Sequence, residues 1–141
     1  MKKNTAQRRL GITLLGNAAA KSPASPKEAT LETFPNQFAD RDYTVTLEAE
    51  DFTSLCPVTG QPDFAAITIS YVPDRKCVET KSLKFYLGSY RNERAFNEEV
   101  VNRIFGDLWK ICEPRWLRVE GEFSARGGVS LSVEVERGKE Q

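Results

Sequence analysis

Alternation of apolar and polar residues in two separate segments constrains the fold of this chain most. Residues 43–50 and 64–71 each carry apolar side chains at every second position. A two-residue period is the pattern of a β-strand with one buried face, so both segments are predicted strands. Residues 96–112 instead repeat apolar side chains every three to four positions, and Pro114 follows them. This pattern predicts a helix that ends before the proline.

The remaining segments complete an α+β pattern. Residues 77–87 are predicted to begin extended and to become helical near Ser82. Strands are predicted at 116–123 and 129–135, joined by a tight turn at residues 126–128, whose paired glycines tolerate positive φ. The order β-β-α-α-β-β predicts a four-stranded antiparallel sheet with two helices on one face. Because the other face and the sheet edges then lack cover, we expect a homo-oligomer in which sheets join.

Composition is that of one folded domain and excludes several functional classes. The 141 residues include 20 Lys and Arg against 20 Asp and Glu, so no net charge favours nucleic acid or an anionic membrane as a partner. No apolar run approaches the ~20 residues of a membrane span, and no signal-peptide core is recognisable, so we expect a cytoplasmic protein. We predict a flexible arm over residues 1–30, one domain over 31–137 and a tail over 138–141.

The absence of histidine restricts the chemistry further. Without it, one subunit type cannot perform Ser-His or Cys-His catalysis or bind zinc through imidazole. General acid–base catalysis would then have to use Asp, Glu, Lys, Tyr or Cys. The three cysteines, Cys56, Cys77 and Cys112, are far apart and odd in number, so we expect neither a disulfide framework nor a metal site.

The segment between the two alternating strands, residues 52–64, is the candidate reactive loop. Two prolines and a glycine are expected to keep all of it irregular. It contains Cys56 and Asp63, a nucleophile and a proton donor on one loop. From residue types alone, a turn with a small buried cysteine and a capping aspartate explains the segment equally well.

Longer motifs favour the catalytic interpretation. Residues 52–57 read Phe-Thr-Ser-Leu-Cys-Pro, residues 60–64 Gly-Gln-Pro-Asp-Phe, and residues 79–86 Glu-Thr-Lys-Ser-Leu-Lys-Phe-Tyr. Together they strongly resemble the short, single-module NADPH-dependent 7-cyano-7-deazaguanine reductases. The flanking segments fit as well: 14–17, 34–36, 41–43 and 126–128. The resemblance implies the tunnelling fold, whose β-β-α-α-β-β subunits join into barrels, and a pentamer or decamer.

The resemblance also implies a reaction and a set of site residues. The family reduces a nitrile to a primary amine with two NADPH, in the queuosine pathway of tRNA modification, and requires no metal. By this resemblance Cys56 adds to the nitrile to form a covalent thioimide, and Asp63 donates the proton. The residues implied to bind the deazaguanine are Val78, Glu79, Thr80, Asn97 and Glu98. A carboxylate can accept hydrogen bonds from both donors of a guanine-like edge, and Glu98 is our choice for that role. From periodicity alone, Glu98 is a solvated acid at a helix N-terminus.

The cofactor site has the weakest sequence signal. No Gly-x-Gly-x-x-Gly follows a predicted strand, so a Rossmann site is not supported. The family motif suggests instead that Lys81, Lys84 and Arg126 meet the phosphates of NADPH. Taken singly, each is more often a solvated surface charge.

Position 97 departs from the family pattern, which has histidine immediately before the glutamate. Asn97 can form hydrogen bonds as a neutral imidazole does, but it carries no proton or charge. This keeps open a non-reducing protein that binds deazapurines. An amidinotransferase-like enzyme on the same scaffold is a further alternative, but it needs no NADPH, and the intact lysine-containing motif disfavours it. A zinc-dependent cyclohydrolase of the same fold is disfavoured by the missing histidines.

Overall fold

The computed structural model describes residue 13 and residues 21–138. The predicted arm over 1–30 and tail over 138–141 therefore lie largely outside the described residues, and the domain bounds stay a prediction. The main sheet has four antiparallel strands in the order β2-β3-β5-β6. Their bounds are Val45–Leu55 for β2, Pro62–Val72 for β3, Trp116–Arg126 for β5 and Val129–Gly138 for β6.

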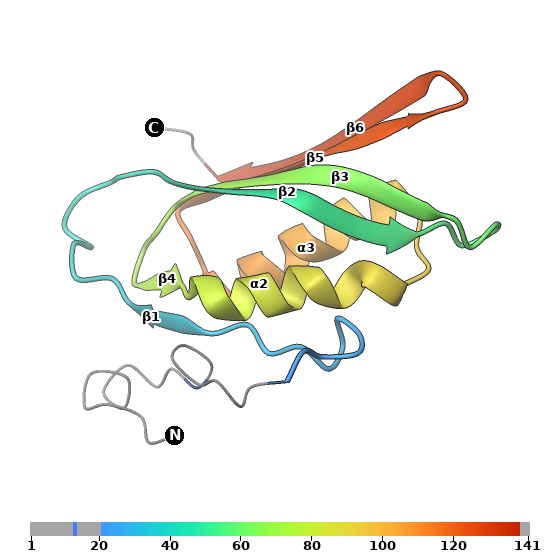
Figure 1. Ribbon diagram of the computed structural model, residues 1–141. Coiled ribbons are helices and arrows are strands. Elements are labelled where there is room, and N and C mark those ends of the chain that lie inside the picture. The colour runs from blue at the N-terminus through green and yellow to red at the C-terminus, as the bar shows by residue number, and fades with distance from the viewer. Residues whose placement is uncertain (1–12, 14–20, 139–141) are drawn as a thin grey trace.

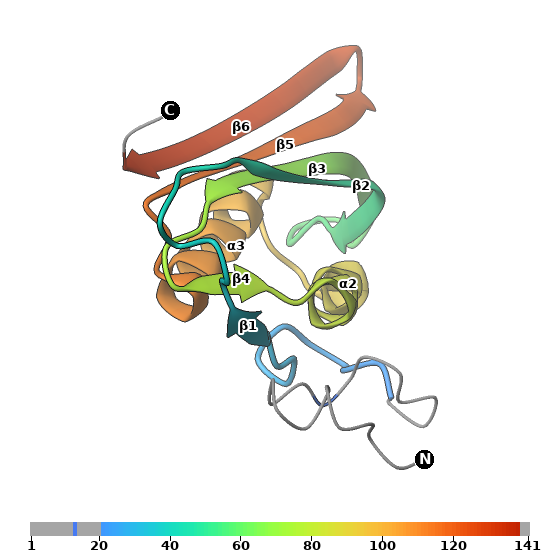
Figure 2. The same ribbon diagram turned by 90° about the vertical axis from the view of Figure 1, so that its left-hand side faces the viewer.

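Two helices lie on one face of this sheet (Figures 1 and 2). They are α2 (Thr80–Gly88), continued by the short 3-10 helix η1 (Ser89–Asn92), and α3 (Asn97–Cys112). The α+β class and the β-β-α-α-β-β order are confirmed. Two short strands, β1 (Thr33–Pro35) and β4 (Lys76–Val78), pair with each other beside the start of α2. β4 agrees with the extended start predicted for residues 77–87, whereas β1 was not predicted.

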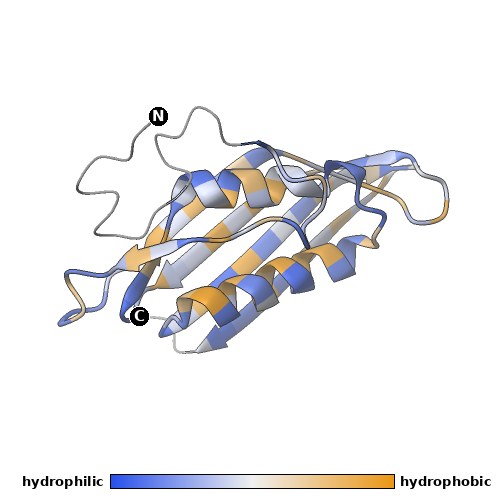
Figure 3. Ribbon diagram, turned by 90° about the horizontal axis from the view of Figure 1, so that it is seen from below, coloured by the Kyte–Doolittle hydropathy of each residue, from blue (hydrophilic) through white to orange (hydrophobic). Residues whose placement is uncertain are grey.

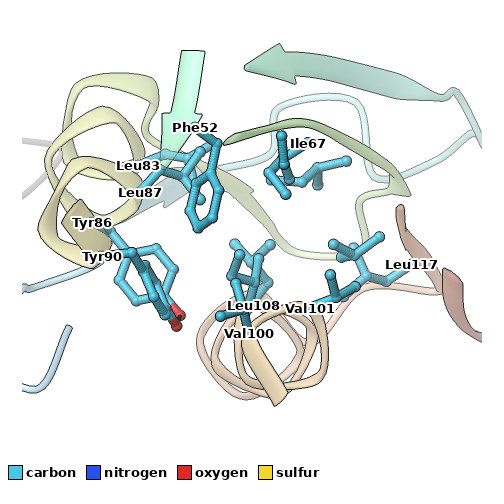
Figure 4. Close-up of a cluster of buried hydrophobic side chains, with 14 of the residues drawn as sticks. Phe52, Ile67, Leu83, Tyr86, Leu87, Tyr90, Val100, Val101, Leu108 and Leu117 are labelled. Carbon is cyan, nitrogen blue, oxygen red and sulfur yellow. Dashed lines mark hydrogen bonds between the residues drawn. The ribbon is translucent and has the colours of Figure 1, made fainter. Parts of the chain in front are cut away.

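The hydrophobic core lies between the sheet and the helices (Figure 4). The alternation along β3 buries Ile67, Ile69 and Tyr71 toward the helices, as its two-residue period predicts. Gly121 of β5 allows a close approach, since a Cβ at this position would lie 2.7 Å from the Val101 Cγ2 of α3. Polar and apolar residues alternate around both helices (Figure 3).

The segment 52–64 is much less irregular than the sequence predicts. Its first four residues extend β2 and its last three begin β3, so only residues 56–61 connect the strands. The prediction was wrong because Pro62 occupies the first position of a strand, where proline is tolerated. The register between β2 and β3 shifts between Ala49 and Phe52. Beyond this irregularity Phe52 and Ser54 are buried, whereas the first half of β2 is only half-buried.

Phe96 also differs from expectation. It is extended (φ −65°, ψ 150°), precedes α3 and is 59% exposed, so it does not belong to the apolar stripe of the helix. Helix α2 begins at Thr80, two residues before the predicted Ser82, because the Glu79 side chain caps its first turn. Within the described part of the chain, no helix is long and apolar enough to cross a membrane.

Candidate active site

A six-residue connection at one end of the sheet holds Cys56. The Cys56 backbone N–H donates to the Gln61 carbonyl (2.8 Å), and the Gly60 N–H donates to the Cys56 carbonyl (2.9 Å). Gly60 has a φ of +72°, which a residue without Cβ adopts freely. These bonds close the loop on itself and leave the thiol half-exposed at the end of a rigid hairpin.

The loop activates the thiol of Cys56. Its pKa is lowered to about 7, first by a hydrogen bond from the Thr59 side chain and then by the backbone N–H groups of Thr59 and Val58. A smaller contribution comes from Arg126, while partial burial acts in the opposite direction. All of these donors stabilise the thiolate, so a substantial fraction of Cys56 is nucleophilic at neutral pH.

Asp63 lies beside the thiol loop and is buried, with 7% of its surface exposed. Its Oδ1 atom lies 3.1 Å from Nη1 of Arg126. The Nη2 atom of Arg126 donates to the Gln61 side-chain oxygen (2.5 Å). Since Arg126 also contributes to the lowered pKa of Cys56, one guanidinium acts on the thiol, the Asp63 carboxyl group and the loop between them. The sequence analysis did not predict this role for Arg126.

The segment that precedes α3 lies beside the end of β2, next to the connection that holds Cys56. The Leu55 N–H donates to the Glu93 carbonyl (2.9 Å), and the Ala95 N–H donates to the Leu55 carbonyl (3.1 Å). This pairing places the Arg94 guanidinium against Gly60, where an added Cβ would lie 2.9 Å from its Nη2. Arg94 carries no motif and was missed by the sequence analysis.

Asn97 and Glu98 follow directly, in the first turn of α3. The Oδ1 atom of Asn97 is buried and has no hydrogen-bond partner in the described part of the chain. Glu98 is exposed, and no cation among the described residues pairs with its carboxylate. Both predicted substrate-binding groups at this end are thus available to a ligand.

Val78, Glu79 and Thr80 lie at the opposite end of the molecule, where β4 leads into α2 (Figure 1). Glu79 is 2% exposed, and its two carboxylate oxygens accept the Lys81 and Ser82 N–H groups at 2.7 Å each. All three predicted substrate-binding residues line a cleft of about 640 Å³. Aromatic side chains form much of its wall: Phe34, Phe38, Tyr43 and Tyr71.

Comparison with known proteins identifies the family. The family model described as "QueF-like protein" matches residues 62–141. The NADPH-dependent 7-cyano-7-deazaguanine reductase of Syntrophus aciditrophicus is 52% identical over 125 residues, which are 89% of this chain and 85% of that protein. The chain belongs to this family. The reductase of the same name from Bacillus subtilis is 49% identical over 129 residues (92% of this chain, 78% of that protein), and that of Nitrosococcus oceani is 50% identical over 114 residues (81% and 88%).

The fold of this reductase family member also agrees with a solved structure. The crystal structure of an archaeosine synthase, QueF-Like, in the apo form superposes with a TM-score of 0.64. It is 22% identical and covers 70% of this chain and 96% of that one, so the likeness concerns the fold. The tunnelling fold expected from the sequence is confirmed.

The cofactor residues expected for a 7-cyano-7-deazaguanine reductase are divided between the two ends. Lys81 and Lys84 lie on α2, and Lys84 lines a cleft of about 830 Å³ together with Arg91. Lysine and arginine side chains are the residue types that bind phosphate groups, so Lys81 and Lys84 stay the predicted cofactor residues. Arg126 lies with Cys56 and Asp63 instead, so one chain does not bring it to the lysines. No group of three or more potential metal ligands occurs among the residues described.

Proposed function

We propose that this protein reduces the nitrile of 7-cyano-7-deazaguanine to the primary amine of 7-aminomethyl-7-deazaguanine, with NADPH as reductant, in queuosine biosynthesis. The observation that carries the proposal is the pairing of an accessible thiol of lowered pKa, Cys56, with a buried carboxyl group, Asp63, on one hairpin. The family supplies the substrate, and its members carry this activity in their names.

Cys56 acts as the nucleophile. Its thiolate adds to the nitrile carbon and forms a C–S bond, while one C–N π bond breaks toward nitrogen. Asp63 enters this step as the protonated acid, with Arg126 beside its Oδ1 and the proton on Oδ2, and delivers that proton to the nitrogen, which leaves a neutral thioimide on Cys56 and an ionised Asp63. The Thr59 and Val58 donors favour the thiolate before the reaction and the departure of sulfur after it.

Reduction needs two hydrides, and NADPH supplies one hydride per molecule when bound. The chain contributes the cations of α2, Lys81 and Lys84, for the cofactor phosphates. Arg126 would join them only from another subunit or after leaving Asp63, since its contacts with Asp63 and Gln61 hold it at the thiol loop.

The complete site is proposed to form between two copies of the chain. Cys56 and Asp63 lie at one end of the sheet and Glu79 at the other, so a single chain cannot close both groups around one small molecule (Figure 1). The segments at the Cys56 end also expose apolar side chains that a partner would cover: Val58, Phe64, Phe96 and Val129. In this arrangement a neighbour's Val78–Thr80 cleft completes the deazaguanine site, and the open sheet face and edges account for a closed assembly.

A direct experiment tests the proposal. Purified protein is mixed with 7-cyano-7-deazaguanine, and NADPH absorbance and intact mass are followed. We expect two NADPH oxidised per product. Without NADPH we expect a mass increase equal to the nitrile, located on Cys56 and absent in Cys56→Ala. No adduct would exclude the covalent mechanism.

Asn97, where the family has histidine, makes a second outcome of this experiment informative. An adduct that forms without later NADPH oxidation would indicate an amidinotransferase-like or non-reducing deazapurine-binding member of the fold. The buried, unpartnered Oδ1 of Asn97 favours continued substrate contact, because a buried acceptor without a partner is costly unless a ligand satisfies it.

A further inference from the structure

Ser54 has a hydroxyl group that the folded chain does not use. The residue is 0% exposed, and its Oγ has no hydrogen-bond partner among the residues described. Two other serines are equally buried but satisfied: Ser82 Oγ donates to the Glu79 carbonyl and Ser89 Oγ to the Tyr86 carbonyl. A buried hydroxyl without a protein partner is destabilising, so Ser54 calls for an explanation that the other two serines do not.

The strand register places Ser54 directly opposite Asp63. The two Cα atoms are partners in the β2–β3 ladder, and both side chains point to the buried, helix-facing side of the sheet. Cβ atoms of directly opposed residues lie about 4.5–5.5 Å apart, so a rotation about χ1 brings a serine hydroxyl within hydrogen-bond reach of a carboxylate. Arg126 contacts Oδ1 of Asp63, whereas Oδ2 has no partner in the described part of the chain.

We propose that Ser54 is a positioning residue for Asp63 that acts during thioimide formation; this rests on the proposed function. Before the reaction, the Ser54 hydroxyl has no hydrogen-bond partner among the described residues. When Asp63 gives its Oδ2 proton to the nitrile nitrogen, the charge that develops on Oδ2 receives a hydrogen bond from the Ser54 hydroxyl, while Arg126 stays at Oδ1. No covalent bond to Ser54 forms or breaks. The bond stabilises the product side of the proton transfer and is absent before it, so it accelerates the step without tightening substrate binding.

Ser54→Ala separates this role from a structural one. With the nitrile and no NADPH, we expect the adduct to form about ten- to a hundredfold more slowly, the range for one hydrogen bond to a charged group. The nitrile concentration for half-maximal rate should change less than threefold. The Tm should stay equal or rise, because no existing hydrogen bond is lost. The matched control, Ser89→Ala, should instead lower the Tm by several degrees and leave the adduct rate unchanged.

The same substitution in an Asp63→Asn background shows whether Ser54 acts through Asp63. Intact mass over hours measures even very slow adduct formation, and here Ser54→Ala should cause no further loss. The proposal is overturned if Ser54→Ala matches the wild-type rate, lowers the Tm as Ser89→Ala does, or slows both backgrounds equally. If Asp63→Asn forms no adduct at all, the adduct rate and the Tm of Ser54→Ala alone decide whether the proposal holds. A wild-type protein that forms no adduct contradicts the proposed function itself, which is a separate result.

Discussion

At the scale of single residues, the Cys56 thiol owes its activation mainly to its own loop. Thr59 and Val58 follow it closely in sequence, and their donors turn back toward the sulfur. Arg126 contributes less because its guanidinium also serves Asp63 and Gln61. The two functions of the hairpin, an ionised thiol and a positioned carboxyl group, are thereby supplied by different donors, and each can be altered separately.

The pH dependence of Cys56 reactivity tests this division. Alkylation by iodoacetamide requires the thiolate, so its rate should rise with pH and reach half its maximum near the pKa of about 7. Thr59→Val removes the largest stabilising donor and should move the midpoint to higher pH. Arg126→Gln should move it in the same direction by less. Equal shifts, or a larger one for Arg126→Gln, would contradict the ranking; Cys56→Ala reports background reaction at Cys77 and Cys112.

Asn97 allows a second test at this scale. If its free Oδ1 meets the substrate, Asn97→Ala should raise KM about five- to tenfold with a smaller change in kcat, since one neutral hydrogen bond contributes about 1 kcal/mol. Asn97→His should change kcat/KM less than tenfold. A gain of several hundredfold in Asn97→His would mean that the native asparagine has impaired or redirected the activity.

At the scale of elements, the periodicity of apolar residues predicted the strands and helices that pack against the core. It missed the features that depend on hydrogen bonds of individual polar side chains. The β3 alternation and the Val100–Cys112 stripe of α3 follow from packing against one core, and both were predicted. The early start of α2 was not, because it depends on Glu79 accepting two backbone N–H groups, and glutamate is not a favoured N-cap. Arg94 reaches Gly60 through pairing between segments about 40 residues apart, which no single-chain periodicity reports.

The connection 56–61 depends on its glycine, which gives a prediction about the whole hairpin. Gly60→Ala places a Cβ at positive φ and 2.9 Å from the Arg94 guanidinium, so we expect a loss of about 1–2 kcal/mol and a displaced thiol. Urea unfolding and the rate of Cys56 alkylation measure the two effects. Gly106→Ala, in the exposed middle of α3 with nothing within 4 Å, should stabilise by about 1 kcal/mol and leave alkylation unchanged. Unaltered alkylation in Gly60→Ala would show that the loop tolerates rearrangement.

At the scale of the whole molecule, the sequence supplied both halves of the candidate site but not their separation. Cys56 and Glu79 are only 23 positions apart in sequence, yet β3 and β4 carry the chain to the far end of the sheet between them (Figure 1). Motifs reveal which residue types are present, whereas the distance between them depends on strand length and direction. A site shared by neighbouring subunits removes this separation, and it agrees with the expectation of a homo-oligomer.

Complementation between two inactive variants distinguishes a shared site from one contained in a single chain. Cys56→Ala retains Glu79, and Glu79→Gln retains Cys56 together with one carbonyl oxygen for the α2 cap. If each site takes its thiol from one subunit and its carboxylate from the next, random mixing of equal amounts should restore about a quarter of wild-type activity. Each variant alone should be nearly inactive but match the wild type in assembled mass. Glu79→Gln should also lower the Tm, because its amide nitrogen cannot accept the second backbone N–H bond. Mixed assemblies without activity would mean that both groups act within one chain, and the β2–β3 hairpin would then have to move far from its observed position.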